Sequence, residues 1–149
     1  MSAIPEENAD GPAAADFPES WFTPPLDREG SYWALVHRGR SVMREKRAVI
    51  CGLARDVAPT LPETMARIER LGDMFAGYRV IIYENDSKDV TRRILDDWMK
   101  ANPRVVVLSE SRGDPVNPAA RCLDRAGRMA FYRNRYREYI ATHLSLIHI

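Results

Sequence analysis

The sequence has almost no net charge and contains no long hydrophobic run. Its 22 Lys and Arg residues nearly balance its 21 Asp and Glu residues, so the formal net charge is +1. A balance of this kind excludes the global basic field that is typical of nucleic-acid-binding proteins. No apolar run approaches the roughly 20 residues that a membrane-spanning helix needs, so we predict no transmembrane segment.

Cysteine is also scarce, and the opening residues lack a targeting signal. Cys51 and Cys122 are far apart and have no CxxC spacing, so we predict free thiols in a reducing cytoplasm. The stretch MSAIPEENADGPAAADFPES is acidic and has no apolar core of the kind found in signal peptides. Because residues 1–25 are rich in Ala, Pro, Asp and Glu, we predict that they form a disordered tail. These features together predict a cytoplasmic protein.

Motifs that identify several common chemistries are missing as well. The sequence has no GxxxxGK phosphate loop and no GxGxxG dinucleotide-binding motif. Its histidines, His37, His143 and His148, lack the spacing of metal ligands. Asp96 and Asp97 are adjacent on a predicted helix, where neighbouring side chains diverge by about 100 degrees. The residues themselves therefore predict no metal site.

Three short apolar runs predict buried strands. They are RAVICGL from Arg47, RVIIYE from Arg79 and RVVVLSE from Arg104, and each is too short for a typical helix. Their nearly continuous apolar character is typical of parallel strands that are covered on both faces. The sequence therefore predicts an α/β fold with a mostly parallel sheet.

Helical patterns precede, separate and follow these runs. The first is a helical lead-in before the first strand. The second opens with the capping-box sequence TLPE at Thr60 and carries apolar residues at helical spacing. The third is stopped by Asn102-Pro103, and the fourth is rich in arginine. The four predicted helices cover residues 26–46, 60–75, 87–102 and about 123–142.

Polar residues follow the first two predicted strands. Short crossover connections bring the carboxyl ends of parallel strands to one edge of a sheet, and ligands bind outside that edge. Arg55-Asp56 follows the first strand, and Glu84-Asn85-Asp86-Ser87 ends the second. A helix cap explains one residue of the second group, but it leaves Glu84 and Asn85 without a role. We therefore predict a ligand site there, and capping combined with solvation is the alternative.

These polar groups belong to three segments that carry a family resemblance. Residues 83–91, YENDSKDVT, resemble the VDDGSTDGT segment of glycosyltransferases with the GT-A fold. The match is closer to the fungal capsule-associated alpha-1,3-mannosyltransferase family and its bacterial relatives. Those proteins show an Arg-Asn or similar pair after the first strand, then YEN-[DG]-S-x-D-x-T, then R-[IM]-x-x-[LY]-x-x-x-RN. This chain has Arg55-Asp56, YENDSKDVT and, at residues 128–134, RMAFYRN.

The resemblance covers residues 47–143 and implies a function. It implies the Rossmann-like nucleotide-binding half of a GT-A hexosyltransferase in polysaccharide biosynthesis, with a sheet that is incomplete at its C-terminal end. The implied reaction transfers a hexose to a saccharide acceptor, and mannose from GDP-mannose is the leading case. Asp86 and Val90 stand where many relatives have Gly, which leaves the local turn geometry open.

The resemblance also implies which residues bind the nucleotide-sugar donor. They are Arg55, Asp56, Glu84, Asn85, Asp86, Arg128, Arg133 and Asn134. Glu84 and Asp86, with Arg55-Asp56, are expected at the nucleoside, and Arg133 and Asn134 at the diphosphate. A manganese or magnesium ion is expected only through a downstream Asp-x-Asp motif, which this sequence lacks. No catalytic residue is assigned.

The arginine-rich helix supports a phosphate-binding role on physical grounds. Residues 112–137 contain seven arginines and no lysines, and a guanidinium can bind phosphate oxygens bidentately. Met129, Tyr136 and Ile140 predict an apolar stripe, and Arg133 falls on or near it. A buried arginine needs an anionic partner, which could be a diphosphate or one of Glu84 and Asp86. The arginines that we expect on a solvated face are Arg125, Arg135 and Arg137.

The last six residues, LSLIHI, do not continue the pattern of the domain. They match the in-frame translation of CTGTCTCTTATACACATC, a transposon end that is used in sequencing libraries. We therefore expect residues 144–149 to be non-native and the chain to be the N-terminal part of a longer enzyme, inactive alone. A natural apolar C-terminus is the alternative. The exposed edge of an incomplete sheet also predicts poor solubility.

Two other function classes stay open. A non-catalytic α/β nucleotide-binding or interaction domain would explain why no Asp-x-Asp motif is present. A nucleotidyltransferase would normally have a Gly-rich phosphate turn near the first strand, and none is found there.

Overall fold

The computed structural model describes residues 24–116 and 122–144. Most of the predicted tail at residues 1–25, and the LSLIHI segment except Leu144, therefore lie outside the described residues. The chain divides into two units, residues 1–39 and 40–149, which are considered separately. The predicted helical lead-in is confirmed as a 3-10 helix, η2 (Leu26–Arg28), followed by α1 (Glu29–Arg44). No residue of α1 is buried, and its Leu35 is 66% exposed.

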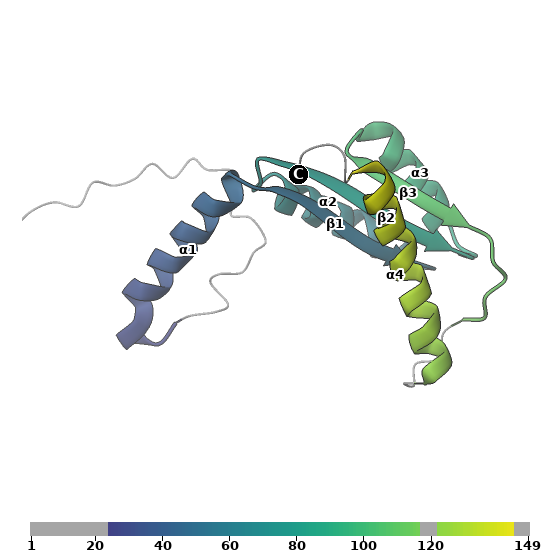
Figure 1. Ribbon diagram of the computed structural model, residues 1–149, viewed down its shortest axis with the longest axis horizontal. Coiled ribbons are helices and arrows are strands. Elements are labelled where there is room, and N and C mark those ends of the chain that lie inside the picture. Colours follow the sequence, from purple (N-terminus) through teal and green to yellow (C-terminus); the bar gives the residue numbers. More distant parts are fainter. Residues whose placement is uncertain (1–23, 117–121, 145–149) are drawn as a thin grey trace, which may run out of the picture. The chain divides into compact units, whose positions relative to one another are not determined.

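Three parallel strands form the sheet of the second unit. They are β1 (Arg47–Ala54), β2 (Gly77–Asn85) and β3 (Val105–Glu110), in that spatial order. The helices are α2 (Leu61–Gly72), α3 (Thr91–Ala101) and α4 (Leu123–His143). Figure 1 shows α4 in front of the sheet, with α2 and α3 behind it. The predicted α/β fold with a parallel sheet and flanking helices is confirmed.

The main hydrophobic core lies between the sheet and helices α2 and α3. Val80 of β2 and Leu95 of α3 are fully buried there, together with Trp98. The register pairs Val80 with Ile50 on one side and Val105 on the other. Because paired residues of neighbouring strands point to the same face, the three strands present one continuous apolar surface to these helices.

Helix α4 covers the opposite face of the sheet and packs on β1 and β2. Ile81 and Tyr83 alternate with the core residues of β2 and are buried on this side. The ring of Tyr83 stacks on the ring of Tyr132, with 5.4 Å between their centroids. Tyr132 is the one buried residue in the described part of α4.

Two predicted helix boundaries are wrong. Helix α2 ends at Gly72 rather than near Phe75, because a turn through Met74 and Phe75 leads directly into β2 at Gly77. Helix α3 begins at Thr91 rather than near residue 87, because residues 86–90 form a separate loop. Strand β2 is longer at both ends than the predicted run.

The predicted capping box at Thr60 does not form. Thr60 makes no side-chain cap to α2, and its hydroxyl donates to the carbonyl of Val57 instead. Its partner in the TLPE sequence, Glu63, is exposed on α2 and pairs with Arg67 one turn later.

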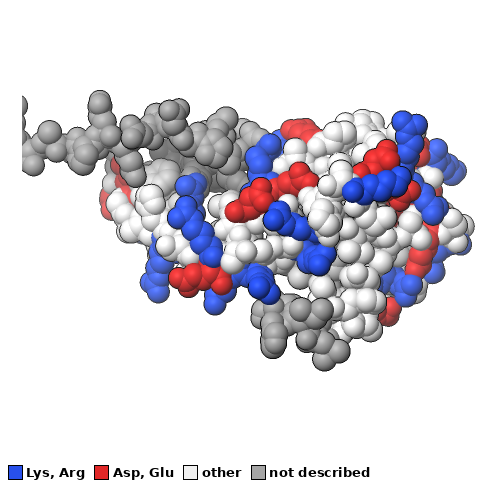
Figure 2. Space-filling view, turned by 90° about the horizontal axis from the view of Figure 1, so that it is seen from above, with Lys and Arg blue, Asp and Glu red and all other residues white. Residues whose placement is uncertain are grey.

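Figure 2 shows positive and negative side chains interspersed over the face in view, in keeping with the small net charge.

Candidate functional site at the carboxyl edge of the sheet

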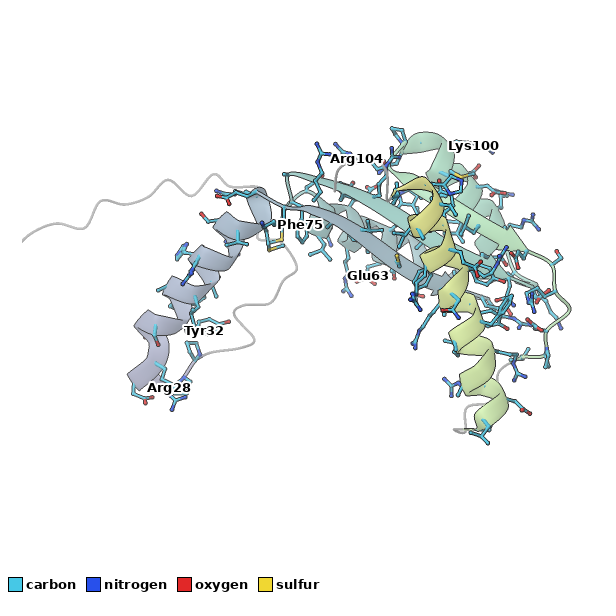
Figure 3. All side chains as sticks on the ribbon, in the orientation of Figure 1. Arg28, Tyr32, Glu63, Phe75, Lys100 and Arg104 are labelled. Atoms are coloured by element: carbon cyan, nitrogen blue, oxygen red, sulfur yellow. The ribbon has the colours of Figure 1, made fainter. Side chains whose placement is uncertain are left out.

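Three loops meet at the carboxyl edge of the sheet. Residues 55–60 follow β1, residues 86–90 follow β2 and residues 111–116 follow β3. We call them the first, second and third rim loops, and together the rim. Parallel strands bring such loops to one edge, which is the usual ligand-binding edge of open α/β sheets. Figure 3 shows polar side chains gathered at this edge, beside α4.

Asp86 fastens the third rim loop to the second. Its Oδ1 accepts hydrogen bonds from the N–H groups of Arg112 and Gly113, both at 2.8 Å. Its Oδ2 accepts the N–H of Asp114 at 3.1 Å and the side-chain amide of Asn85 at 2.9 Å. Desolvation disfavours the charged carboxylate, but these hydrogen bonds outweigh it and lower the pKa of Asp86 to about 2.

Asp56 fastens the second rim loop to the first. Its Oδ1 accepts the N–H groups of Lys88 at 2.6 Å and Asp89 at 3.3 Å. In the return direction, the N–H of Val57 donates to the hydroxyl of Thr91 at 2.8 Å. The start of α3 is therefore fixed to the loop after β1.

Asp56 and Asp86 share an uncommon backbone conformation. Their φ angles are 51° and 56°, and no other described residue except glycine has a positive φ. This left-handed conformation costs a non-Gly residue about 1 kcal/mol, and Asp is among the residues that adopt it most readily. The Gly that many proteins of the resembled family carry at the position of Asp86 suits the same backbone.

Arg55 joins the first rim loop to the third and so completes a ring of contacts. Its Nη2 donates to the carbonyl of Asp114 at 2.8 Å, and its Nη1 donates to the carbonyl of Pro115 at 3.1 Å. The side chain is only 15% exposed, and its ion pair with Asp56 is loose, with 4.0 Å between Nε and Oδ2. Its Nε is buried and has no hydrogen-bond partner among the described residues. Two neutral carbonyl oxygens, rather than a carboxylate, therefore accept the hydrogen bonds that hold this guanidinium in place.

Glu84 and Asn85 lie beneath the rim and are 1% and 3% exposed. One carboxylate oxygen of Glu84 accepts the N–H of Ser87 at 3.0 Å, and the other accepts the hydroxyl of Ser109. Register places Glu84 beside Ser109 of β3. In this conformation Glu84 supports the turn into the second rim loop and does not face solvent.

The three predicted residues of α4 are not equivalent. Arg128 is half-buried, whereas Arg133 and Asn134 are exposed. The prediction that Arg133 lies on the apolar stripe is wrong, because Tyr132 occupies the buried position. The next residue along a helix points about 100 degrees away, which turns Arg133 outward.

The sequence reasoning missed an ion pair that holds α4 to the sheet. Arg135 Nε donates to Oε1 of Glu110 at 2.8 Å, and the hydroxyl of Tyr83 donates to Oε2 at 2.9 Å. Desolvation opposes the charged form of Glu110, but these bonds outweigh it and hold its pKa below the ordinary value. Arg135 is expected on a solvated face, and its side chain is 40% exposed, but its ion pair with Glu110 was not predicted. The polar ending of the third apolar run, Ser109-Glu110, was a signal that could have indicated Glu110.

A second contact links α4 to the third rim loop. The hydroxyl of Tyr132 donates to Oδ2 of Asp114 at 3.0 Å, and Arg112 Nε donates to the same oxygen at 2.9 Å. The guanidinium of Arg112 also lies 4.0 Å from the centroid of the Phe131 ring. The third rim loop is thus held both by Asp86 and by α4.

No protein-family model, curated protein or solved structure matches this chain. Within residues 24–116 and 122–144, no three His, Cys, Asp or Glu side chains are arranged to hold a metal ion. None of the helices in the described part of the chain is long and apolar enough to cross a membrane. Cys51 is half-buried, Cys122 is exposed, and both are free thiols, as predicted.

Proposed function

We propose that this chain is the donor-binding part of a hexosyltransferase with the GT-A fold, and that its rim binds the nucleoside diphosphate of a sugar nucleotide. GDP-mannose is the first donor to test, and the expected acceptor is a saccharide. The proposal is supported by the resemblance of three segments to glycosyltransferases. It is also supported by the parallel sheet, whose carboxyl edge is where such folds bind ligands. The two free thiols support a cytoplasmic location.

The observation that carries the proposal is the environment of Arg55. Its guanidinium is largely buried at the rim and is held mainly by two carbonyl oxygens. Its ion pair with Asp56 is loose, at 4.0 Å, so the charge of this largely buried cation is only partly compensated, and the cation gains stability when a further anion binds beside it. The buried Nε–H is the one side-chain donor of the described residues that is buried without a partner. A diphosphate supplies both the charge and the acceptor oxygens.

Arg128 is the second cation that we assign to the diphosphate. It lies on α4 four residues before Tyr132, so both residues share one face of the helix. Tyr132 reaches Asp114 of the third rim loop, which directs this face toward the rim. Arg133 and Asn134 are exposed and stay candidates for contacts to the donor from outside.

The test is calorimetric titration of the 149-residue chain with GDP, UDP and their sugars, with and without manganese. We expect binding of a nucleoside diphosphate, and we expect Arg55→Ala to weaken it about tenfold or more, since a charged hydrogen bond is lost. Arg67→Ala is the matched control, because Arg67 carries the same charge on an exposed turn of α2. Absence of binding by the folded protein rejects the donor site.

A non-catalytic nucleotide-binding domain is the second candidate. It is favoured by the lack of an Asp-x-Asp motif in the sequence and of a metal-ligand group among the described residues. No metal-dependent step is assigned to these residues. Transfer or hydrolysis of GDP-mannose by the product of the source locus read past codon 143 distinguishes the two, since the second candidate predicts binding alone.

A further inference from the structure

The carboxylate of Asp86 can fix the position of the Arg55 guanidinium without contacting it. We infer that Asp86 is a positioning residue, which fixes the backbone of residues 112–115 so that this backbone holds the Arg55 guanidinium. The resemblance instead implies that Asp86 contacts the nucleoside. The inference rests on the proposed function only for the part of its test that uses a ligand.

The first link runs from the carboxylate to the loop. Asp86 accepts three consecutive backbone N–H groups, those of Arg112, Gly113 and Asp114, at 2.8 to 3.1 Å. Hydrogen bonds to an ionised acceptor are roughly twice as strong as neutral ones. These three bonds define the path of the loop from β3 to Pro115, including the positive φ of Gly113 at 69°.

The second link runs from the loop to the guanidinium. The carbonyl of Asp114 accepts Nη2 of Arg55, and the carbonyl of Pro115 accepts Nη1. Asp114 belongs to both links, because its N–H bonds Asp86 while its C=O bonds Arg55. A shift of this one peptide therefore moves the acceptors of the guanidinium.

The two links use two of the five N–H donors of the Arg55 guanidinium. Both terminal nitrogens are engaged by the loop, and the buried Nε has no partner among the described residues. The carboxylate of Asp86 already accepts four hydrogen bonds, so it has little capacity left for a ribose hydroxyl. In this arrangement Arg55 binds the ligand, and Asp86 fixes the loop that positions Arg55.

The first test needs no ligand and follows the Nε–H signal of Arg55 by ¹H–¹⁵N NMR, assigned by its loss in Arg55→Lys. Burial protects this proton from exchange with water in the wild type. We expect its exchange to rise at least about tenfold in Asp86→Gly, which keeps the positive φ but removes the carboxylate. Asp86→Asn keeps one acceptor oxygen, so its exchange rate is expected to lie between those of the wild type and Asp86→Gly. The control is Asp97→Asn, an equal charge change on the exposed surface of α3.

The second test is a double-mutant cycle on GDP affinity. Asp86→Gly is expected to weaken GDP binding about tenfold in the wild-type background, because the guanidinium loses its fixed position. In the Arg55→Ala background the same change is expected to alter affinity by less than about twofold. A role in overall stability alone predicts the same loss in both backgrounds.

The outcomes separate the two proposals. An unchanged Arg55 Nε–H signal in Asp86→Gly and Asp86→Asn, or an equal loss of affinity in both backgrounds, overturns the positioning role. If the wild type binds neither GDP nor UDP, the proposed function fails, and the NMR signal decides the positioning role on its own. If Asp86→Gly does not fold, Asp86→Asn decides by the same readouts.

Discussion

At the scale of single residues, Asp56 and Asp86 repeat one device at successive strands. Each follows its strand, adopts a positive φ and accepts N–H groups from the loop after the next strand. The left-handed backbone turns the carboxylate toward that neighbouring loop. For each aspartate, several hydrogen bonds to the charged carboxylate therefore offset the modest strain of the left-handed backbone.

Asp86 makes stability depend on pH in a predictable window. Its pKa is lowered to about 2 in the folded protein, whereas an unperturbed Asp has a pKa of about 3.9. A depressed pKa contributes stability that is present above about pH 4 and is lost as pH falls toward 2. We expect Asp86→Asn to be less stable than wild type at pH 7, with a difference that shrinks as the pH is lowered through this window.

Urea unfolding of both proteins from pH 2 to pH 7 measures this difference. Asp97→Asn serves as the control, because its carboxylate is exposed and pairs only with Lys100 in the described part of the chain. A difference between wild type and Asp86→Asn that is constant with pH contradicts the assignment of these hydrogen bonds to the charged form.

At the scale of elements, one glycine sets how α2 meets the sheet. A Cβ at Gly72 would lie 2.6 Å from the ring atoms of Tyr78, which is itself buried. We expect Gly72→Ala to destabilise the fold by about 1–3 kcal/mol, because the ring or the helix must shift. Chemical denaturation measures the change in the free energy of unfolding.

Gly127 in α4 is the matched control for this substitution. Apart from its chain neighbours and the backbone of α4 itself, a Cβ there would have no described atom within 4 Å. Because Ala is the better helix former, Gly127→Ala is expected to stabilise the protein by up to about 1 kcal/mol. Equal effects at both positions would show that helix propensity, rather than the contact with Tyr78, decides the outcome.

Helix α4 shows the limit of reading a helical face from sequence. Met129, Tyr136 and Ile140 predicted a sparse apolar stripe, and the described residue of α4 that is most buried is Tyr132. Tyr132 combines an apolar ring with a hydroxyl, so it satisfies both the stack on Tyr83 and the bond to Asp114. A sparse pattern of three apolar residues could not reveal that Tyr132 occupies the buried position.

At the scale of the whole molecule, α4 brings the end of the described chain back onto its middle. Tyr132 is buried against Tyr83, and Arg135 reaches Glu110 at the end of β3. We expect Tyr132→Ala to destabilise the protein by about 3–5 kcal/mol through the loss of a buried aromatic ring. Tyr132→Phe keeps the ring stack and is expected to cost about 1 kcal/mol for the lost hydrogen bond.

Urea denaturation of these two variants checks the ranking. Arg137→Ala is the control, because Arg137 lies on the exposed face of α4 and contacts Asn134 there. A cost for Tyr132→Phe that matches that of Tyr132→Ala contradicts the assignment of most of the stability to the ring.

The sequence by itself determined the alternation of strands and helices and the parallel arrangement of the sheet. These depend on short-range patterns of apolar residues, which are visible in windows of 6 to 12 residues along the chain. The sequence also placed Arg55, Asp56 and residues 84–86 at the carboxyl edge, because topology alone sends strand ends there.

Only the tertiary structure decided which polar groups are already engaged. Arg55 and Asp114 are 59 residues apart in sequence, and Asp86 and Gly113 are 27 apart. Contacts between such distant residues leave no local pattern, so the sequence could not show that Asp86 is saturated by backbone donors. The sequence predicted a ligand site at this edge, and the packing of three loops decided that Arg55 Nε is buried without a hydrogen-bond partner among the described residues.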